Sequence, residues 1–106
     1  MTDKITILKD LKDCLQIGLN GSVRDIILFG SQASEQASES SDYDVLIVLD
    51  KDYDARIENK VYDMCYDINL KYDIIIDAHL ISTRELKTLR GKQPIFTKAI
   101  QTGLYA

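Results

Sequence analysis

The N-terminal segment has apolar residues at three- and four-residue steps, the spacing that lines up one face of an α-helix. The apolar positions are Ile5, Leu8, Leu11, Leu15 and Leu19. Asn20-Gly21 follows directly and is typical of a helix C-terminus or a turn. The pattern therefore predicts an amphipathic helix that ends near Asn20.

Two short apolar runs come next and predict buried strands. The first is Val23–Phe29, which ends at Gly30, and the second is Asp42–Leu49, which is rich in Val, Ile and Leu. Residues 31–41 between them contain only Ser, Gln, Ala and Glu, without an apolar stripe. They predict a loop or one short exposed helix.

The second half of the chain alternates the two periodicities again. A second amphipathic helix is indicated by Ile57, Val61, Met64, Cys65 and Ile68. The segment 72–81 predicts a third strand, because its alternate positions separate into two faces. One face carries Ile74, Ile76, Ala78 and Leu80, and the other carries Asp73, Ile75, Asp77, His79 and Ile81.

Two short helices are expected at the C-terminal end. Ser82 and Glu85 form a capping-box pattern that predicts a helix over Thr83–Leu89, which Gly91 ends. Pro94 opens a last helix that runs to Gly103. The resulting order α-β-β-α-β-α-α indicates an α/β fold of two or three layers in a single domain, residues 1–106.

Composition narrows the class of protein. A chain of 106 residues with 45% hydrophobic residues is enough for one folded core. No stretch approaches the roughly 20 apolar residues of a membrane span, and the charged N-terminus does not resemble a secretory signal. Cys14 and Cys65 are expected to be buried free thiols rather than a disulfide or zinc site. These features favour a soluble cytoplasmic protein with no membrane partner.

Charge is negative overall and unevenly distributed. The formal net charge of −4 makes binding to a nucleic-acid backbone unlikely. Residues 31–54 contain seven acidic residues and one basic residue, whereas residues 82–106 contain five basic residues and one acidic residue. An acidic cluster is commonly a solvated loop, but it is also how proteins bind divalent cations, so the spacing of its members must decide.

The spacing of Asp42 and Asp44 favours a metal site. Two residues apart on a strand, their carboxylates would point to one face, about 6–7 Å apart along the backbone. Their mutual repulsion would be removed by a cation, and hard oxygen ligands suit Mg²⁺ or Mn²⁺. Gly30-Ser31 follows the preceding strand, where a glycine allows a ligand close to the backbone and a helical turn would direct N–H groups at a phosphate.

These two features together resemble a known signature. The sequence GSQASEQASESSDYD, residues 30–44, resembles that of the minimal nucleotidyltransferases of the DNA polymerase β superfamily, G-S-x-A-R-G, a spacer, and S-D-x-D before an apolar strand. The resemblance covers nearly the whole chain, and it implies the polymerase β-like fold, a small mixed β-sheet flanked by helices.

The resemblance also implies an activity and a site. It implies transfer of a nucleoside monophosphate from an NTP, with ATP the expected donor, to a hydroxyl group by a two-metal mechanism using Mg²⁺ or Mn²⁺. It assigns nucleotide binding to Gly30, Ser31 and Ser41, and metal binding and catalysis to Asp42 and Asp44. A third carboxylate on the next strand completes such a site.

The sequence departs from the family pattern at two places. Ser34-Glu35 replaces the expected Arg-Gly, which puts a negative charge near the expected triphosphate. At the position of the third carboxylate the chain has His79, and neutral imidazole is a poor Mg²⁺ ligand. Asp77 or Asp73 on the same predicted face would have to substitute, Asp77 more easily, with His79 at the rim of the site.

Two functions of different classes follow. In the first, the protein is a metal-dependent nucleotidyltransferase that modifies a protein or small molecule; the resemblance implies a small helical HEPN-type partner, with this chain as antitoxin. In the second, the departures have weakened or removed catalysis, and the protein is a docking module that neutralises a partner by binding alone.

Overall fold

In the described part of the chain, helices and strands follow the predicted order, except that a 3₁₀ turn replaces the helix expected over Thr83–Leu89 and one further 3₁₀ turn and one short strand are added. The structure is a computed structural model that describes residues 3–33, 42–88 and 90–106. The elements are α1 (Lys4–Gly18), β1 (Val23–Phe29), η1 (Gly30–Ala33), β2 (Tyr43–Leu49), α2 (Ala55–Tyr72), β3 (Ile76–Ser82), η2 (Glu85–Lys87), α3 (Pro94–Thr102) and β4 (Leu104–Tyr105). Within the described residues, no helix has both the length and the apolar character needed to cross a membrane.

Four strands form one mixed sheet in the order β3-β2-β1-β4. β1 pairs antiparallel with β2 on one side and with β4 on the other. β2 and β3 are parallel, and α2 provides the long crossover that parallel neighbours require. The sheet confirms the expected mixed α/β fold.

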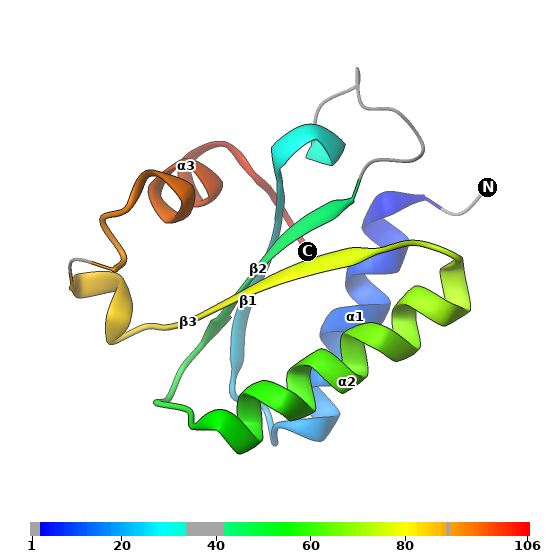
Figure 1. Ribbon diagram of the computed structural model, residues 1–106, viewed down its shortest axis with the longest axis horizontal. Coiled ribbons are helices and arrows are strands. Elements are labelled where there is room, and N and C mark those ends of the chain that lie inside the picture. Colours follow the sequence, from blue (N-terminus) through cyan, green and yellow to red (C-terminus); the bar gives the residue numbers. More distant parts are fainter. Residues whose placement is uncertain (1–2, 34–41, 89) are drawn as a thin grey trace.

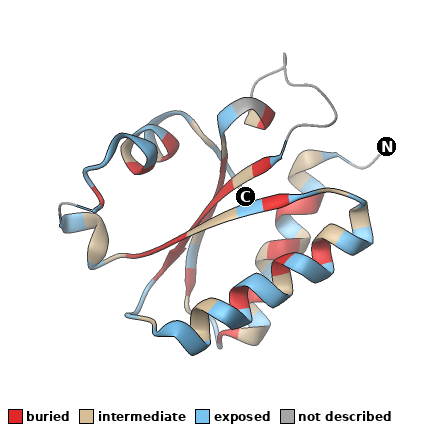
Figure 2. Ribbon diagram, in the orientation of Figure 1, coloured by how far each residue is buried: buried red, intermediate tan, exposed pale blue. Residues whose placement is uncertain are grey.

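Helices cover both faces of the sheet, so the fold has three layers (Figure 1). The apolar stripes of α1 and α2 pack on one face, against alternate residues of β1, β2 and β3. α3 packs on the opposite face through Phe96 and Ala99. The strands between the two layers are the most completely buried part of the chain (Figure 2). This burial on both faces explains why β1 and β2 are nearly continuous apolar runs.

The third strand begins later than predicted, because α2 continues to Tyr72. Asp73 then ends the helix in a left-handed conformation, φ 54° and ψ 50°, with its N–H donating to the carbonyl of Asn69. The strand starts at Ile76, whose N–H donates to the Asn69 side chain at 2.9 Å. The prediction of a strand over 72–81 is therefore wrong at its N-terminal end, and Asp73 does not share a strand face with Asp77.

Three smaller expectations are also corrected. The capping box is present, with reciprocal hydrogen bonds between Ser82 and Glu85 of 3.1 and 3.2 Å. However, it begins only a three-residue 3₁₀ turn, because the chain folds back at Gly91, whose N–H donates to the Glu85 carbonyl. Cys14 is exposed, since it lies off the buried stripe of α1, whereas Cys65 is buried as expected. β4, which has only two residues, was not predicted.

Candidate active site

Three chemically active side chains gather on the sheet face that α3 covers. Leu46 of β2 and Ile81 of β3 pack under α3. Asp44 precedes Leu46 by two residues, and Asp77 and His79 precede Ile81 by four and two. Because side chains alternate along a strand, all three point to the same face, beyond the part that α3 fills.

The register between the two parallel strands brings these side chains together. Asp44 is the direct partner of Asp77 in the β2–β3 pairing. One possible ligand atom from each of Asp44, Asp77 and His79 lies within 4.8 Å of the other two. The His79 Nε2 atom is 3.6 Å from the Asp77 carboxylate, and the imidazole centroid is 5.4 Å from that of Phe29.

The cluster has the donor set of a metal site. Among the residues that the structure describes, it is the one group of three or more acidic, His or Cys side chains placed to hold an ion. Asp44 is half-buried, whereas 56% of the Asp77 side chain is exposed. Two carboxylates with one open side fit a hard divalent cation that also keeps water or substrate oxygens as ligands.

Asp42 and Asp73 lie outside this cluster. Asp42 is exposed and stands one residue before β2, so the predicted strand begins one residue too early. It nevertheless lies close enough for its charge to raise the pKa of Asp44. Asp73 is the C-cap of α2 and is not part of β3. It therefore does not share a strand face with Asp77, which was the reason to consider it as the third carboxylate.

The environment of Asp44 opposes its ionisation. Burial is the largest cause of its raised pKa, followed by the negative charge of Asp77, and Asp42 adds to the effect while His79 lowers it. Partial burial and a neighbouring negative charge both make the ionised form of a carboxyl group less stable than it is in water. A bound cation would reverse this balance.

This raised pKa leads to an expected pH dependence of stability. Asp44 holds its proton more tightly in the folded than in the unfolded protein, so its contribution to the free energy of unfolding falls as pH rises from 3.8 through the folded-state pKa. We expect Asp44→Asn to match wild type below pH 3.8 and to be the more stable protein at neutral pH. Urea unfolding in EDTA across this range measures the difference. A difference independent of pH would contradict the expectation.

Gly30, the first residue after β1, allows Asp44 to occupy its position. Its φ of +72° lies in the left-handed region, and a Cβ atom placed there would be 2.3 Å from Asp44 Oδ2 and 3.3 Å from Asp44 Cβ. Both the conformation and the close approach therefore require glycine. The turn that holds this glycine is fixed from the other side, because Lys4 Nζ donates to the carbonyl of the buried Gln32 at 2.8 Å.

Gly30→Ala is expected to damage both the fold and the carboxylate cluster. A non-glycine residue in the left-handed region costs about 1–2 kcal/mol, and the new methyl group would also displace the Asp44 carboxylate. Gly21→Ala is the matched control, because Gly21 has φ +77° but no atom within 4 Å of the added Cβ. Chemical denaturation and Mn²⁺ titration of both variants test this. Equal Mn²⁺ affinity in the two would show that the contact with Asp44 is unimportant.

The remaining predicted nucleotide-binding residues are only partly described. The backbone of Ser31 belongs to the η1 turn. Ser34, Glu35 and Ser41 lie outside the described residues, so their expected roles stay predictions.

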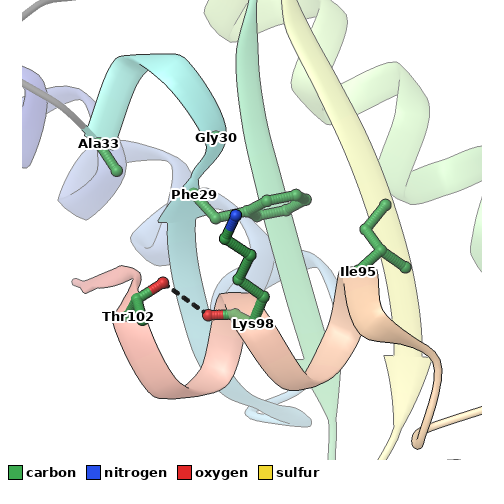
Figure 3. Close-up of a pocket in the computed structure, with 6 residues that line it drawn as sticks. All are labelled: Phe29, Gly30, Ala33, Ile95, Lys98 and Thr102. Atoms are coloured by element: carbon green, nitrogen blue, oxygen red, sulfur yellow. Dashed lines mark hydrogen bonds between the residues drawn. The ribbon is translucent and has the colours of Figure 1, made fainter.

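A pocket of about 270 Å³ adjoins the cluster, between η1 and α3 (Figure 3). It is lined by Phe29, Gly30, Ala33, Ile95, Lys98 and Thr102. Neither Phe29 nor Lys98 is predicted as a site residue by the sequence, because Phe29 ends the pattern of a buried strand and Lys98 belongs to a basic segment typical of a solvated face. The one signal in the sequence was the contrast in charge between Lys98, in the basic C-terminal segment, and the acidic residues 31–54.

Comparison with known proteins gives matches over most of the chain. The family model described as "Nucleotidyltransferase domain" matches residues 6–99. Two Methanocaldococcus jannaschii proteins are named "Putative protein adenylyltransferase". MJ0604 is 38% identical over 79 residues, 74% of this chain and 73% of the relative. MJ0141 is 33% identical over 84 residues, 79% of this chain and 84% of the relative.

A solved structure shows the same fold. A mutant of the toxin–antitoxin MntA–HpeT superposes with a TM-score of 0.54 at 17% identity, covering 93% of this chain and 70% of that chain. The length of the family match, together with the identity to the two archaeal relatives, establishes the assignment: this chain belongs to the nucleotidyltransferase domain family.

Proposed function

We propose that this protein transfers AMP from ATP to a hydroxyl group of a partner protein, with Asp42, Asp44 and Asp77 as the catalytic, metal-binding carboxylates. The observation that carries the proposal is the direct pairing of Asp44 with Asp77 beside Gly30. A nucleotidyltransferase takes its nucleotidyl group from a nucleoside triphosphate, and a protein acceptor is supported by the names of the two archaeal relatives.

The chemistry needs two Mg²⁺ or Mn²⁺ ions, which when bound stabilise the attacking and leaving oxygens of an in-line displacement. In this proposal the half-buried Asp44 fixes the nucleotide end of the site. Asp77 faces solvent, where an acceptor can reach it, and so serves the attacking hydroxyl. The acceptor hydroxyl gives its proton to the Asp77 carboxylate, and its oxygen forms a bond to the α-phosphorus. The bond from the α-phosphorus to the bridging oxygen breaks, and pyrophosphate leaves.

His79 has a supporting role in this proposal. Its Nε2 atom lies near the Asp77 carboxylate, and its ring contacts Phe29. Since imidazole is a poor ligand for Mg²⁺, we assign His79 to the rim of the site, where it orients Asp77. Purely carboxylate ligation is consistent with either Mg²⁺ or Mn²⁺.

The partner that we propose is a small helical toxin of the HEPN type, with this chain as its antitoxin. The fold shared with a component of the toxin–antitoxin MntA–HpeT supports a role of this kind. A docking module without catalysis is the second candidate, favoured by His79 at the position of the usual third carboxylate.

A labelling experiment separates the two. The protein is incubated with Mg²⁺ or Mn²⁺ and the product of a neighbouring reading frame, using ATP labelled in either the α- or the γ-phosphate. We expect label in the partner from α-labelled ATP only. Neutralisation of the partner without label would favour the docking module.

A further inference from the structure

The pocket between η1 and α3 opens directly beside the carboxylate cluster. Gly30 lines this pocket and also faces the Asp44 carboxylate. Phe29 lines it as well, and its ring contacts the imidazole of His79. A nucleotide whose α-phosphate lies at the carboxylates therefore has this pocket as its immediate neighbour.

Lys98 supplies the one charged side chain among the residues that line the pocket. It extends from α3 toward Phe29 and the η1 turn (Figure 3), and its backbone is held in the helix, with its carbonyl also accepting from Thr102 at 2.8 Å. In the described part of the chain its ammonium group makes no ion pair. Lys98 is therefore available for a ligand.

The charge of the site calls for such a cation. The carboxylates of Asp42, Asp44 and Asp77 and a triphosphate together carry more negative charge than two divalent cations neutralise, so a further cation would stabilise the occupied site. Lys4, the basic residue that holds the η1 turn, already donates to Gln32. Arg90 pairs with Glu85. A lysine ammonium, with three donors on a flexible stem, is well suited to phosphate oxygens.

We propose that Lys98 binds the β- and γ-phosphates of the nucleotide and thereby positions its α-phosphate beside Asp44 and Asp77. This inference rests on the proposed function, and it adds a binding residue outside the segment of residues 30–44. It assigns the η1–α3 pocket to the leaving pyrophosphate group rather than to the acceptor.

Calorimetry with an unreactive ATP analogue, in which a methylene group joins the α- and β-phosphates, tests the inference in the presence of Mg²⁺. We expect Lys98→Gln to weaken binding of the analogue by about 10- to 100-fold, the loss of one charge-assisted contact. Binding of AMP, which lacks the β- and γ-phosphates, should change little, and Lys98→Arg should recover most of the affinity. Thermal unfolding establishes that each variant is folded.

Lys60→Gln is the matched control, because Lys60 is exposed on α2, on the opposite face of the sheet. It removes the same charge and should bind the analogue as wild type does. Equal affinities of the Lys98 and Lys60 variants would overturn the inference and leave the proposed function intact, as would an equal loss for AMP and the analogue. Wild type that binds neither nucleotide would instead contradict the proposed function.

Discussion

The double substitution Asp42→Asn/Asp44→Asn is expected to abolish AMP transfer and to remove saturable Mn²⁺ binding. Asp44 is the half-buried carboxylate of the cluster, and the charge of Asp42 raises its pKa. Loss of the groups that hold charge at a phosphoryl-transfer centre costs at least about 100- to 1,000-fold in rate. Labelled transfer and Mn²⁺ titration measure the two effects.

The control for this variant is Asp63→Asn/Asp67→Asn, two exposed acids four residues apart on α2. It changes the net charge by the same amount, so a general electrostatic effect on cation or nucleotide binding would appear in both. In EDTA the Asp42/Asp44 variant should fold at least as well as wild type, because repulsion within the cluster is relieved. Wild-type Mn²⁺ affinity in that variant would show that the metal lies elsewhere.

Asp77→Asn is expected to abolish transfer while binding of ATP stays nearly intact. The Asp77 carboxylate is the more exposed member of the pair with Asp44. In the proposed function it serves the acceptor hydroxyl rather than the nucleotide. Asparagine keeps the shape of the side chain but loses the charge that favours an activated hydroxyl. Transfer of label from α-labelled ATP and calorimetry with the unreactive analogue separate the two steps.

Asp73→Asn is the matched control for Asp77→Asn. Asp73 caps α2 in the left-handed conformation, which asparagine also adopts readily, so this variant should remain folded and active. Loss of activity in Asp73→Asn with full activity in Asp77→Asn would show that Asp77 is not the third carboxylate.

His79→Asp adds a further distinction between enzyme and docking module. It restores a carboxylate at the position that the family pattern expects, in a strand two residues from Asp77. If wild type is a docking module without transfer, this variant should gain measurable transfer. If wild type is active through Asp77, the substitution places a further negative charge beside Asp44 and should lower the rate.

The sequence alone determined most of the local structure and the identity of the central motif. Residues that are buried in the fold are apolar, and they recur with the period of the helix or strand that carries them. The apolar stripe of α2 and the continuous apolar runs of β1 and β2 could therefore be recognised in the sequence. Pro94 and Gly103 likewise marked the ends of α3 correctly. Gly30 and Asp44 were found because residues close in sequence formed one motif.

Only the tertiary structure decided how distant segments meet. The alternation of side chains along a strand does not determine its register against a neighbouring strand. Asp77, rather than His79, lies opposite Asp44 because of the way β3 pairs with β2. The start of β3 depended on Asn69, which bonds both to the end of α2 and to the first strand residue. Lys98 reaches the pocket because α3 packs back over the sheet through Phe96 and Ala99. These relations arise from contacts between residues far apart in the chain, where local propensity carries no information.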